Sequence, residues 1–350
     1  MSFTISRPSA QRPSEPPPNP RTSSNSSRRF SQTREVVENS LGLVIVLVLL
    51  IAFFSFQTAH FFSATTFQAI ANEIPTAIFI AIGMTFVLII GGIDLSVGSV
   101  LALGAGILGV AIVQWHWPLW AAITLCVVSG ALCGLLNGFL TIRFRLPSFI
   151  VTLGLMEAAR GATYLVTNSQ TMYIGSAVEG IDNVTLFGLS LPFLVAIAFA
   201  IVAQFVLTGS VFGRYAIALG TNEEAVRLSG IDTRPIKLAV FGLSGALAAL
   251  GGVSYCAQLS SADPNAGSGF ELAAIAAVVI GGTSLMGGRG SVINSLFGVL
   301  VIAVLETGLA QIGAQESAKR MVTGAVIIIA VIVDFYRTRR ADAKSRSVNL

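Results

Sequence analysis

Charged residues are scarce in this chain of 350 residues, at 11% of the total, whereas soluble globular proteins carry about 25%. Hydrophobic residues make up 54%, and the mean hydropathy is +0.80. One aqueous core cannot bury that much apolar surface, so most of the chain is expected to lie in lipid. Three cysteines are too few for a disulfide framework, and the 35 glycines show no triplet period, which excludes a collagen-like fold.

Sequence signals for nucleotide and metal chemistry are also missing. A P-loop needs glycine, lysine and then serine or threonine, but the one Lys-Ser pair, at residues 344–345, follows an alanine in a basic tail. Cys126 and Cys133 share a predicted helix face without a third ligand. The two histidines lie at span ends without acidic or cysteine neighbours in sequence. We therefore expect no catalytic residue, cofactor or metal ion on this chain.

Positive charge is concentrated in the two ends of the chain. Residues 1–40 hold six arginines against three glutamates, and residues 335–350 hold five basic residues against one aspartate. The part between has 10 basic and 13 acidic residues, so a basic surface for a nucleic-acid partner is not visible. Residues 1–40 also contain ten serines and six prolines, a composition typical of a disordered tail.

Apolar stretches of about 20 residues are long enough to cross ~30 Å of hydrocarbon as helices. About ten are found, at residues 41–59, 70–90, 96–114, 118–140, 147–167, 189–207, 234–257, 270–286, 291–312 and 319–336. Glycines and short connections in the third and eighth could equally make broken or re-entrant helices. The sequence therefore predicts an all-α polytopic membrane protein, with its transmembrane domain at residues 41–336 and a second basic tail at residues 337–350.

The distribution of Lys and Arg predicts the orientation. With the N-terminus in the cytoplasm and ten crossings, 18 of the 21 basic residues fall on the cytoplasmic side. The loop at residues 168–188, on the other side, contains neither Lys nor Arg. This bias predicts an even number of crossings with both termini cytoplasmic. Eight or twelve crossings would fit the ends equally well.

The stretch GGIDLSVGS at residues 91–99 places a carboxylate among glycines and hydroxyls where two apolar segments break. An ionisable residue at membrane depth is costly, so Asp94 is expected to face a partner or a wet cavity. It could also cap the helix that begins near Ser96, or fix the break structurally. With Gly92 and Gly98, these residues form a candidate motif for either structure or substrate contact.

Glycines recur at every fourth position at Gly130, Gly134 and Gly138. One face of that helix lacks side chains, so another backbone can approach it closely. The pattern predicts helix packing, and Asn137 beside it could serve either that packing or a solute pathway.

The longest polar interval between spans lies in a predicted cytoplasmic loop at residues 208–233 and reads as one or two short helices. Its charged residues form opposite-charge pairs at helical spacing. An ordinary solvated loop would have such pairs too. However, Ala225, Val226 and Leu228 would leave an exposed apolar stripe, and such a stripe suits the groove of a partner.

Four stretches resemble the permease subunits of ribose-type ABC importers, sugar transporters served by a periplasmic binding protein. The resemblance covers about residues 65–335 and rests on segments in the expected order: GGIDLSVGS at 91–99, PSFIVTLGLMEAARG at 147–161, GTNEEAVRLSGI at 220–231 and IAAVVIGGTSLMGGRGSV at 275–292. The third segment departs once, since the family commonly has a second alanine where Val226 stands. The long N-terminal tail is also unlike the family.

The resemblance implies a transporter subunit, not an enzyme. In such systems two permease subunits, identical or similar, form the pore in the bacterial inner membrane. A periplasmic sugar-binding protein delivers the sugar, and a separate ATPase, which carries ATP and Mg²⁺, binds a cytoplasmic coupling helix. Carried over to this chain, the ATPase-coupling residues are Gly220, Asn222, Glu223, Glu224, Ala225, Ser229 and Gly230.

An importer of a pentose, hexose or polyol must release its cargo, so its contacts should be few and weak. Hydroxyl and amide side chains suit this better than charges, and Asn137, Thr152 and Thr163 are candidates. Other small solutes, such as branched-chain amino acids or nucleosides, remain alternative cargoes.

An ion-coupled secondary transporter is the alternative mechanism. It would use acidic residues at mid-membrane, and Glu157 and Glu306 are available. Arg160 follows Glu157 by three residues, a spacing that suits an internal ion pair.

Overall fold

The computed structural model describes residues 24–332 apart from 176, 179–180, 182–184, 187 and 316, with side chains from residue 41 onward except those of residues 185 and 186. The chain divides into two units at residue 38, and the second unit is Asn39–Leu350. The predicted tails lie outside the described residues at 1–23 and 337–350.

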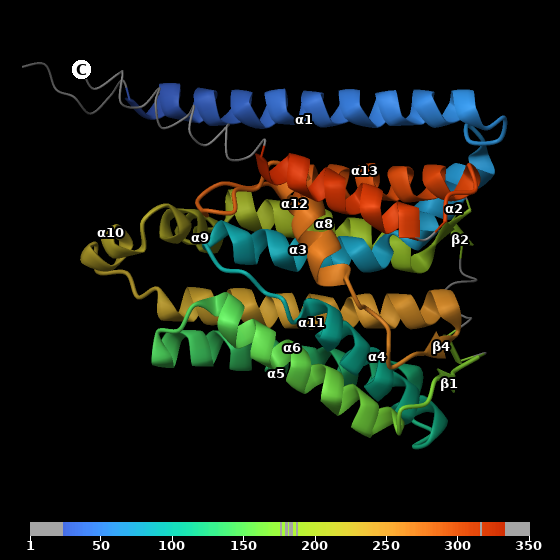
Figure 1. Ribbon diagram of the computed structural model, residues 1–350. Helices are drawn as coiled ribbons and strands as arrows, with labels where there is room; N and C mark the ends of the chain where they lie inside the picture. Colours follow the sequence, from blue (N-terminus) through green and yellow to red (C-terminus); the bar gives the residue numbers. More distant parts are fainter. Residues whose placement is uncertain are drawn as a thin grey trace, which may run out of the picture. The chain divides into compact units, whose positions relative to one another are not determined.

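Helices dominate the described chain (Figure 1). They are α1 (Ser24–Gln57), α2 (Ala64–Glu73), α3 (Pro75–Ile89), α4 (Val97–Val113), α5 (Leu119–Phe144), α6 (Ser148–Thr167), α8 (Leu191–Gly209), α9 (Val211–Thr221), α10 (Glu223–Leu228), α11 (Arg234–Leu259), α12 (Phe270–Ile280) and α13 (Val292–Gln311). Residues 317–332 are also helical. The prediction of a mainly helical chain is therefore confirmed.

Five helices in the described residues are long and apolar enough to cross a membrane, namely α5, α6, α8, α11 and α13. The pair α2 and α3 counts as a sixth if taken as one span bent by 50°. The apolar part of α1, Leu41–Gln57, and the helices α4 and α12 are shorter. At 1.5 Å per residue, α12 spans only about 17 Å, well short of the hydrocarbon core. These lengths favour broken helices at α4 and α12, and the count of ten crossings stays a prediction.

The helix α1 begins at Ser24, inside the segment 1–40 for which the sequence predicts disorder. Extending an existing helix adds one backbone hydrogen bond for each residue fixed, whereas nucleating a new helix is unfavourable. The apolar helix from Leu41 onward can therefore extend toward the N-terminus into polar sequence.

The predicted span at residues 70–90 is two helices, because the chain bends between α2 and α3. The hydroxyl of Ser63 accepts a hydrogen bond from the backbone N–H of Thr66 and so caps the start of α2. Pro75 occupies the first position of α3, where its missing N–H costs nothing and its fixed φ suits a helix start. Ser63 and Pro75 are both recognisable helix-start residues in the sequence. The apolar pattern that continues across Pro75 nevertheless favours one uninterrupted span at residues 70–90.

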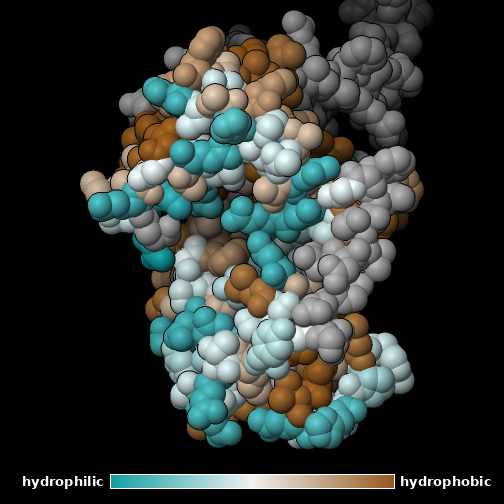
Figure 2. Space-filling view, turned by 90° about the vertical axis from the view of Figure 1, so that its right-hand side faces the viewer, coloured by the Kyte–Doolittle hydropathy of each residue, from teal (hydrophilic) through white to brown (hydrophobic). Residues whose placement is uncertain are grey.

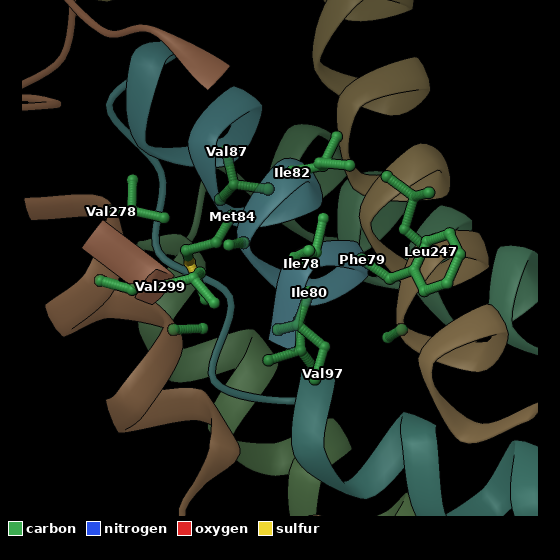
Figure 3. Close-up of a cluster of buried hydrophobic side chains, with 14 of the residues drawn as sticks. Ile78, Phe79, Ile80, Ile82, Met84, Val87, Val97, Leu247, Val278 and Val299 are labelled. Atoms are coloured by element: carbon green, nitrogen blue, oxygen red, sulfur yellow. The ribbon is translucent and has the colours of Figure 1, made fainter. Parts of the chain in front are cut away.

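The core is built around α3, in which 14 of 15 residues are buried. Figure 3 shows its side chains, among them Ile80 and Met84, packed among side chains of neighbouring helices. They include Val97 of α4, Leu247 of α11 and Val299 of α13. A helix that is apolar on every side belongs in the interior of a bundle, and α3 occupies that place.

The helices α5 and α11 approach each other closely along the predicted glycine face. A Cβ on Gly130 would overlap the carbonyl oxygen of Gly245, and one on Gly134 would overlap that of Phe241. Gly138, on α5, faces Leu238 of α11. The predicted packing role of this glycine face is therefore confirmed.

Replacing Gly134 with alanine is expected to destabilise the protein, because the new methyl group would collide with the α11 backbone. Overpacking of this kind costs about 1–3 kcal/mol. The matched control is Gly154→Ala on α6, where a Cβ would meet nothing within 4 Å. In a thermal unfolding assay on purified protein, Gly134→Ala should melt several degrees below Gly154→Ala; equal melting temperatures would contradict this packing.

Short strands tie the loops at one end of the unit. β1 (Met172–Tyr173) pairs antiparallel with β4 (Ser261–Ala262), and β2 (Thr185–Leu186) pairs with β3 (Leu189–Ser190). The end of the molecule that carries α2 and these strands faces the viewer in Figure 2, where hydrophilic residues cover much of the surface. The pair of β1 and β4 joins the loop after α6 to the loop after α11.

Candidate functional site

The segment between α3 and α4 contains Asp94, whose side chain is 1% exposed. Its Oδ1 accepts hydrogen bonds from the backbone N–H of Ser96 at 3.0 Å and from the hydroxyl of Ser96 at 2.6 Å. Its Oδ2 accepts one from the hydroxyl of Ser244, on α11, at 2.9 Å. Ser96, not Asp94, is the N-cap residue of α4. The carboxylate therefore fixes the turn that precedes α4 and ties it to α11.

Side chains of two further helices hold the same segment. On α6, the hydroxyl of Ser148 accepts a hydrogen bond from the N–H of Ile93 at 2.9 Å, and that of Thr152 accepts one from the N–H of Leu95 at 3.1 Å. The amide nitrogen of Asn137, on α5, donates to the hydroxyl of Ser96 at 2.9 Å. The N–H groups of Ile93 and Leu95, in the irregular backbone between the two helices, are thus satisfied by protein side chains, as irregular backbone in a membrane protein requires.

The predicted pathway residues Asn137, Thr152 and Thr163 are each 0% exposed. Asn137 and Thr152 belong to the Asp94 network, together with Ser96. Thr163 lies apart, and its hydroxyl donates to the carbonyl of Ala159 within α6. Their role in a pathway stays a prediction, and in this structure their polar groups face protein.

Gly92 and Gly98 are positions of close approach. A Cβ on Gly92 would lie 3.3 Å from the ring of Phe241. A Cβ on Gly98 would overlap both the carbonyl oxygen of Gly267 and the carboxylate of Glu271. The start of α4 therefore lies directly against the start of α12.

The end of α9 forms a second junction, with the end of α3 and the loop after α12. Gly220 lies so close to Ile89 that a Cβ on Gly220 would overlap the carbonyl oxygen of Ile89. That oxygen accepts a hydrogen bond from the N–H of Gly288 at 2.8 Å. Gly288 has φ +75°, a backbone conformation that L side chains rarely adopt. A Cβ on Gly287 would meet the carbonyl oxygen of Gly220 and the backbone nitrogen of Gly91, so the stretches at residues 91–99, 220–231 and 275–292 meet at one place.

The helix α10 is held in position by its own first residues. The side-chain oxygen of Asn222 accepts a hydrogen bond from the N–H of Ala225 at 2.9 Å and caps the helix. The carboxylate of Glu223 accepts hydrogen bonds from the ammonium of Lys237 at 2.7 Å and from the hydroxyl of Thr233. Glu223 thus ties α10 to the start of α11, and of the predicted coupling residues Gly220, Asn222 and Glu223 have structural contacts.

The remaining predicted coupling residues lie on the surface of α10 and just after it: Glu224, Ala225, Ser229 and Gly230. Glu224 is 66% exposed and lies 3.5 Å from Arg227, and Leu228 is 80% exposed. Val226 is only 7% exposed, so the predicted apolar stripe of Ala225, Val226 and Leu228 is wrong at its middle member. Successive residues of a helix are 100° apart, which turns Val226 to the inner side.

The suggested ion pair between Glu157 and Arg160 does not form among the described residues. The guanidinium of Arg160 instead donates to the backbone carbonyls of Pro264 and Ala266, at 3.1 and 2.7 Å. Glu157 and Glu306, the acidic residues suggested for ion coupling, are both exposed. In the described part of the chain, no three His, Cys, Asp or Glu side chains are grouped to hold a metal ion.

Three residues of these networks were missed from the sequence: Ser148, Ser244 and Gln204. The amide oxygen of Gln204, on α8, accepts a hydrogen bond from the N–H of Val292 at 2.8 Å and so supports the start of α13. A polar residue inside an apolar helix is the signal that could have found Ser244 and Gln204. Their partners lie 150 and 88 positions away in the chain, so the sequence alone could not name them.

Comparisons with known proteins agree with these motifs. Residues 66–331 match the family described as branched-chain amino acid transport system, permease component. No solved structure matches the chain.

Three curated relatives align with most of the chain. The ribose import permease protein RbsC of Haemophilus influenzae is 40% identical over 302 residues, covering 83% of this chain and 92% of the relative. The fructose import permease protein FrcC of Rhizobium meliloti is 32% identical over 304 residues, 84% of each chain. The L-arabinose ABC transporter permease protein AraH of Azospirillum brasilense is 31% identical over 306 residues, 87% of this chain and 90% of the relative. This chain therefore belongs to that family of transport-system permeases, in the branch of the ribose-type ABC import permeases.

Proposed function

We propose that this chain is the transmembrane permease subunit of an ATP-driven importer and forms the translocation pathway for a monosaccharide or a related polyol. The three relatives are named as import permeases for ribose, fructose and L-arabinose. Their similarity extends over more than four fifths of this chain, and this coverage supports the same kind of cargo.

The observation that carries the proposal is the projection formed by α9 and α10 (Figure 1). Its base is fixed, because Gly220 packs on the end of α3 and Glu223 binds the start of α11. Its outer surface presents Glu224 and the exposed Leu228. A rigid base under an exposed amphipathic surface is suited to transmit the movement of a bound partner to the core of the bundle.

The partner in this proposal is a separate ABC ATPase that binds the loop at residues 208–233 and carries ATP and Mg²⁺. A periplasmic binding protein delivers the sugar, and a second permease subunit, identical or similar, completes the pore. The domain at residues 41–336 crosses the bacterial inner membrane about ten times, and the tails at residues 1–40 and 337–350 are cytoplasmic. The bias in Lys and Arg supports this orientation.

Reconstitution into liposomes tests the function. The chain, co-purified with its ATPase and supplied with the binding protein, is expected to import radiolabelled D-ribose only when ATP is present. Omitting the ATPase, or replacing ATP with a non-hydrolysable analogue, should abolish uptake. Uptake by the chain alone, driven by a proton or sodium gradient, would support the ion-coupled alternative and reject this proposal.

An amino-acid cargo is the second candidate, because the matching family is described as a permease component of branched-chain amino acid transport systems. Competition distinguishes the two cargo classes. Excess unlabelled D-ribose, D-fructose or L-arabinose should inhibit uptake of the labelled sugar, whereas L-leucine should not. ATP-dependent uptake of L-leucine without sugar uptake would favour the second candidate.

A further inference from the structure

A charged residue lies halfway along α6 and faces outward. Glu157 follows the first residue of α6, Ser148, by nine positions, which is about 14 Å along a helix of ~30 Å. Its side chain is exposed in the single chain. A carboxylate at the middle of the hydrocarbon layer is costly in lipid, so it is found facing protein or water. Glu157 therefore marks a face of α6 that is not covered by lipid.

The irregular segment at residues 263–269 lies beside this part of α6. Arg160 holds it by donating to the carbonyls of Pro264 and Ala266, and the hydroxyl of Tyr164 lies 2.9 Å from the side-chain oxygen of Asn265. Arg160 and Tyr164 are about 18 and 24 Å along α6 from its start. The segment thus runs at membrane depth without regular secondary structure.

Part of this segment is uncovered by the chain. Asn265, Ser268 and Gly269 are exposed, and a Cβ on Gly269 would meet nothing within 4 Å. Non-helical backbone at membrane depth is tolerated only where it is buried in protein or lines water, because lipid cannot satisfy its polar groups. Since these three residues are exposed in their own chain, they face either water or a second protein chain, and not lipid.

Glu271 extends the same surface to the meeting point of two helix starts. It lies in the first turn of α12, and its Oε1 accepts a hydrogen bond from the N–H of Gly269 at 3.2 Å. Its other oxygen lies against Gly98, in the first turn of α4. The positive ends of both helix dipoles favour a carboxylate there.

We infer that Glu157, Tyr164, Asn265, Ser268 and Glu271 line the water-filled translocation pathway and bind a neutral, polyhydroxylated solute. The inference rests on the proposed function and adds to it the residues that line the pathway. Carboxylate, amide and hydroxyl oxygens accept hydrogen bonds from sugar hydroxyls.

The charges of this surface disfavour the carboxylate of an anionic or amino-acid cargo. Glu157 and Glu271 are acidic, and so is Asp263, whose Oδ1 accepts hydrogen bonds from Asn265. The cationic side chain of the surface, Arg160, already donates to two backbone carbonyls. The carboxylate of an amino acid would therefore meet like charges at Glu157, Asp263 and Glu271, whereas a neutral solute would not.

Thiol labelling tests whether the surface is wet. Ser268→Cys and Asn265→Cys are compared with Val202→Cys near the middle of the largely apolar α8, where the side chain is 60% exposed. Cys133 is half-buried and is replaced by alanine in every variant, whereas Cys126 and Cys256 are buried. In permeabilised membranes, a charged methanethiosulfonate reagent should label residues 265 and 268 at least tenfold faster than residue 202. Equal rates at all three positions would overturn the inference, whether lipid or a second copy covers the surface.

Protection from labelling tests the ligand class. D-ribose at high concentration should slow the labelling of Ser268→Cys, whereas L-leucine at the same concentration should not. Protection by L-leucine alone, or by neither solute, would overturn the assignment of a neutral polyhydroxylated ligand. In the Ser268→Cys variant, adding Asn265→Ala should raise the D-ribose concentration that gives half-maximal protection about fivefold, the effect of one lost hydrogen bond to the solute. An unchanged concentration would remove Asn265 from the solute contacts.

Failure of the inference and failure of the proposed function give different results. Labelling needs no ATP. Rapid labelling of residue 268 without ATP-dependent uptake would therefore reject the proposed importer function, but it would still support a water-exposed surface at this residue. ATP-dependent uptake with slow labelling would leave the importer and reject these residues as its pathway.

Discussion

Replacing Asp94 with alanine is expected to destabilise the protein more than any other single change in the segment between α3 and α4. The carboxylate accepts three hydrogen bonds, two from Ser96 and one from Ser244. Its removal leaves these donors buried without an acceptor, and each such loss costs about 1–3 kcal/mol. A total of several kcal/mol is a large part of the stability of a typical domain, ~5–15 kcal/mol.

The measurement is the melting temperature and the yield of monodisperse protein after solubilisation. Asp94→Asn keeps one oxygen and should fall between the wild type and Asp94→Ala. Asp232→Ala is the matched control, because Asp232 is exposed and its Oδ1 accepts a single hydrogen bond, from the N–H of Arg234. If Asp94→Ala and Asp232→Ala have equal melting temperatures, the hydrogen bonds of Asp94 do not stabilise the segment between α3 and α4.

Helix positions were predictable because hydropathy and length are local properties of the chain. The predicted spans at 118–140, 147–167 and 291–312 lie within four residues of α5, α6 and α13 at both ends. The break before Pro75 was missed, because a run of apolar residues is equally compatible with one long helix and two short ones. The start of α1 was placed late for a related reason, since a helix can extend beyond its apolar part.

Which side chains meet across helices was not predictable from one sequence. The pattern at residues 91–99 identifies Asp94 as unusual, but its partner Ser244 is 150 positions away, so the sequence cannot show that the two side chains meet. Asn137 and Thr152 were chosen for chemistry that suits a sugar, and the structure places both in the Asp94 network. The predicted span at 270–286 and the helix α12 both begin at Phe270, so Glu271 lies in the first turn of each, but nothing in the sequence places it against Gly98.

Replacing Glu224 with arginine is expected to uncouple transport from ATP while leaving the membrane helices folded. Glu224 is 66% exposed, and its ionic contact with Arg227 is also exposed, so the change costs little stability. On the proposed docking surface, however, a reversed charge meets the partner directly, and like charges placed together at an interface cost several kcal/mol. We expect co-purification of the ATPase and ATP-dependent uptake to fall at least tenfold, with an unchanged melting temperature.

Controls separate docking from general effects of charge and backbone strain. Glu73→Arg reverses an exposed charge at the end of α2 and should leave ATPase association unchanged. Gly230 has φ +80° with open space around it, so Gly230→Ala reports backbone strain alone and Gly230→Arg adds bulk and charge. Association should therefore fall further for Gly230→Arg than for Gly230→Ala. If Glu224→Arg and Gly230→Arg both retain the ATPase at wild-type levels, the coupling surface lies elsewhere on the chain.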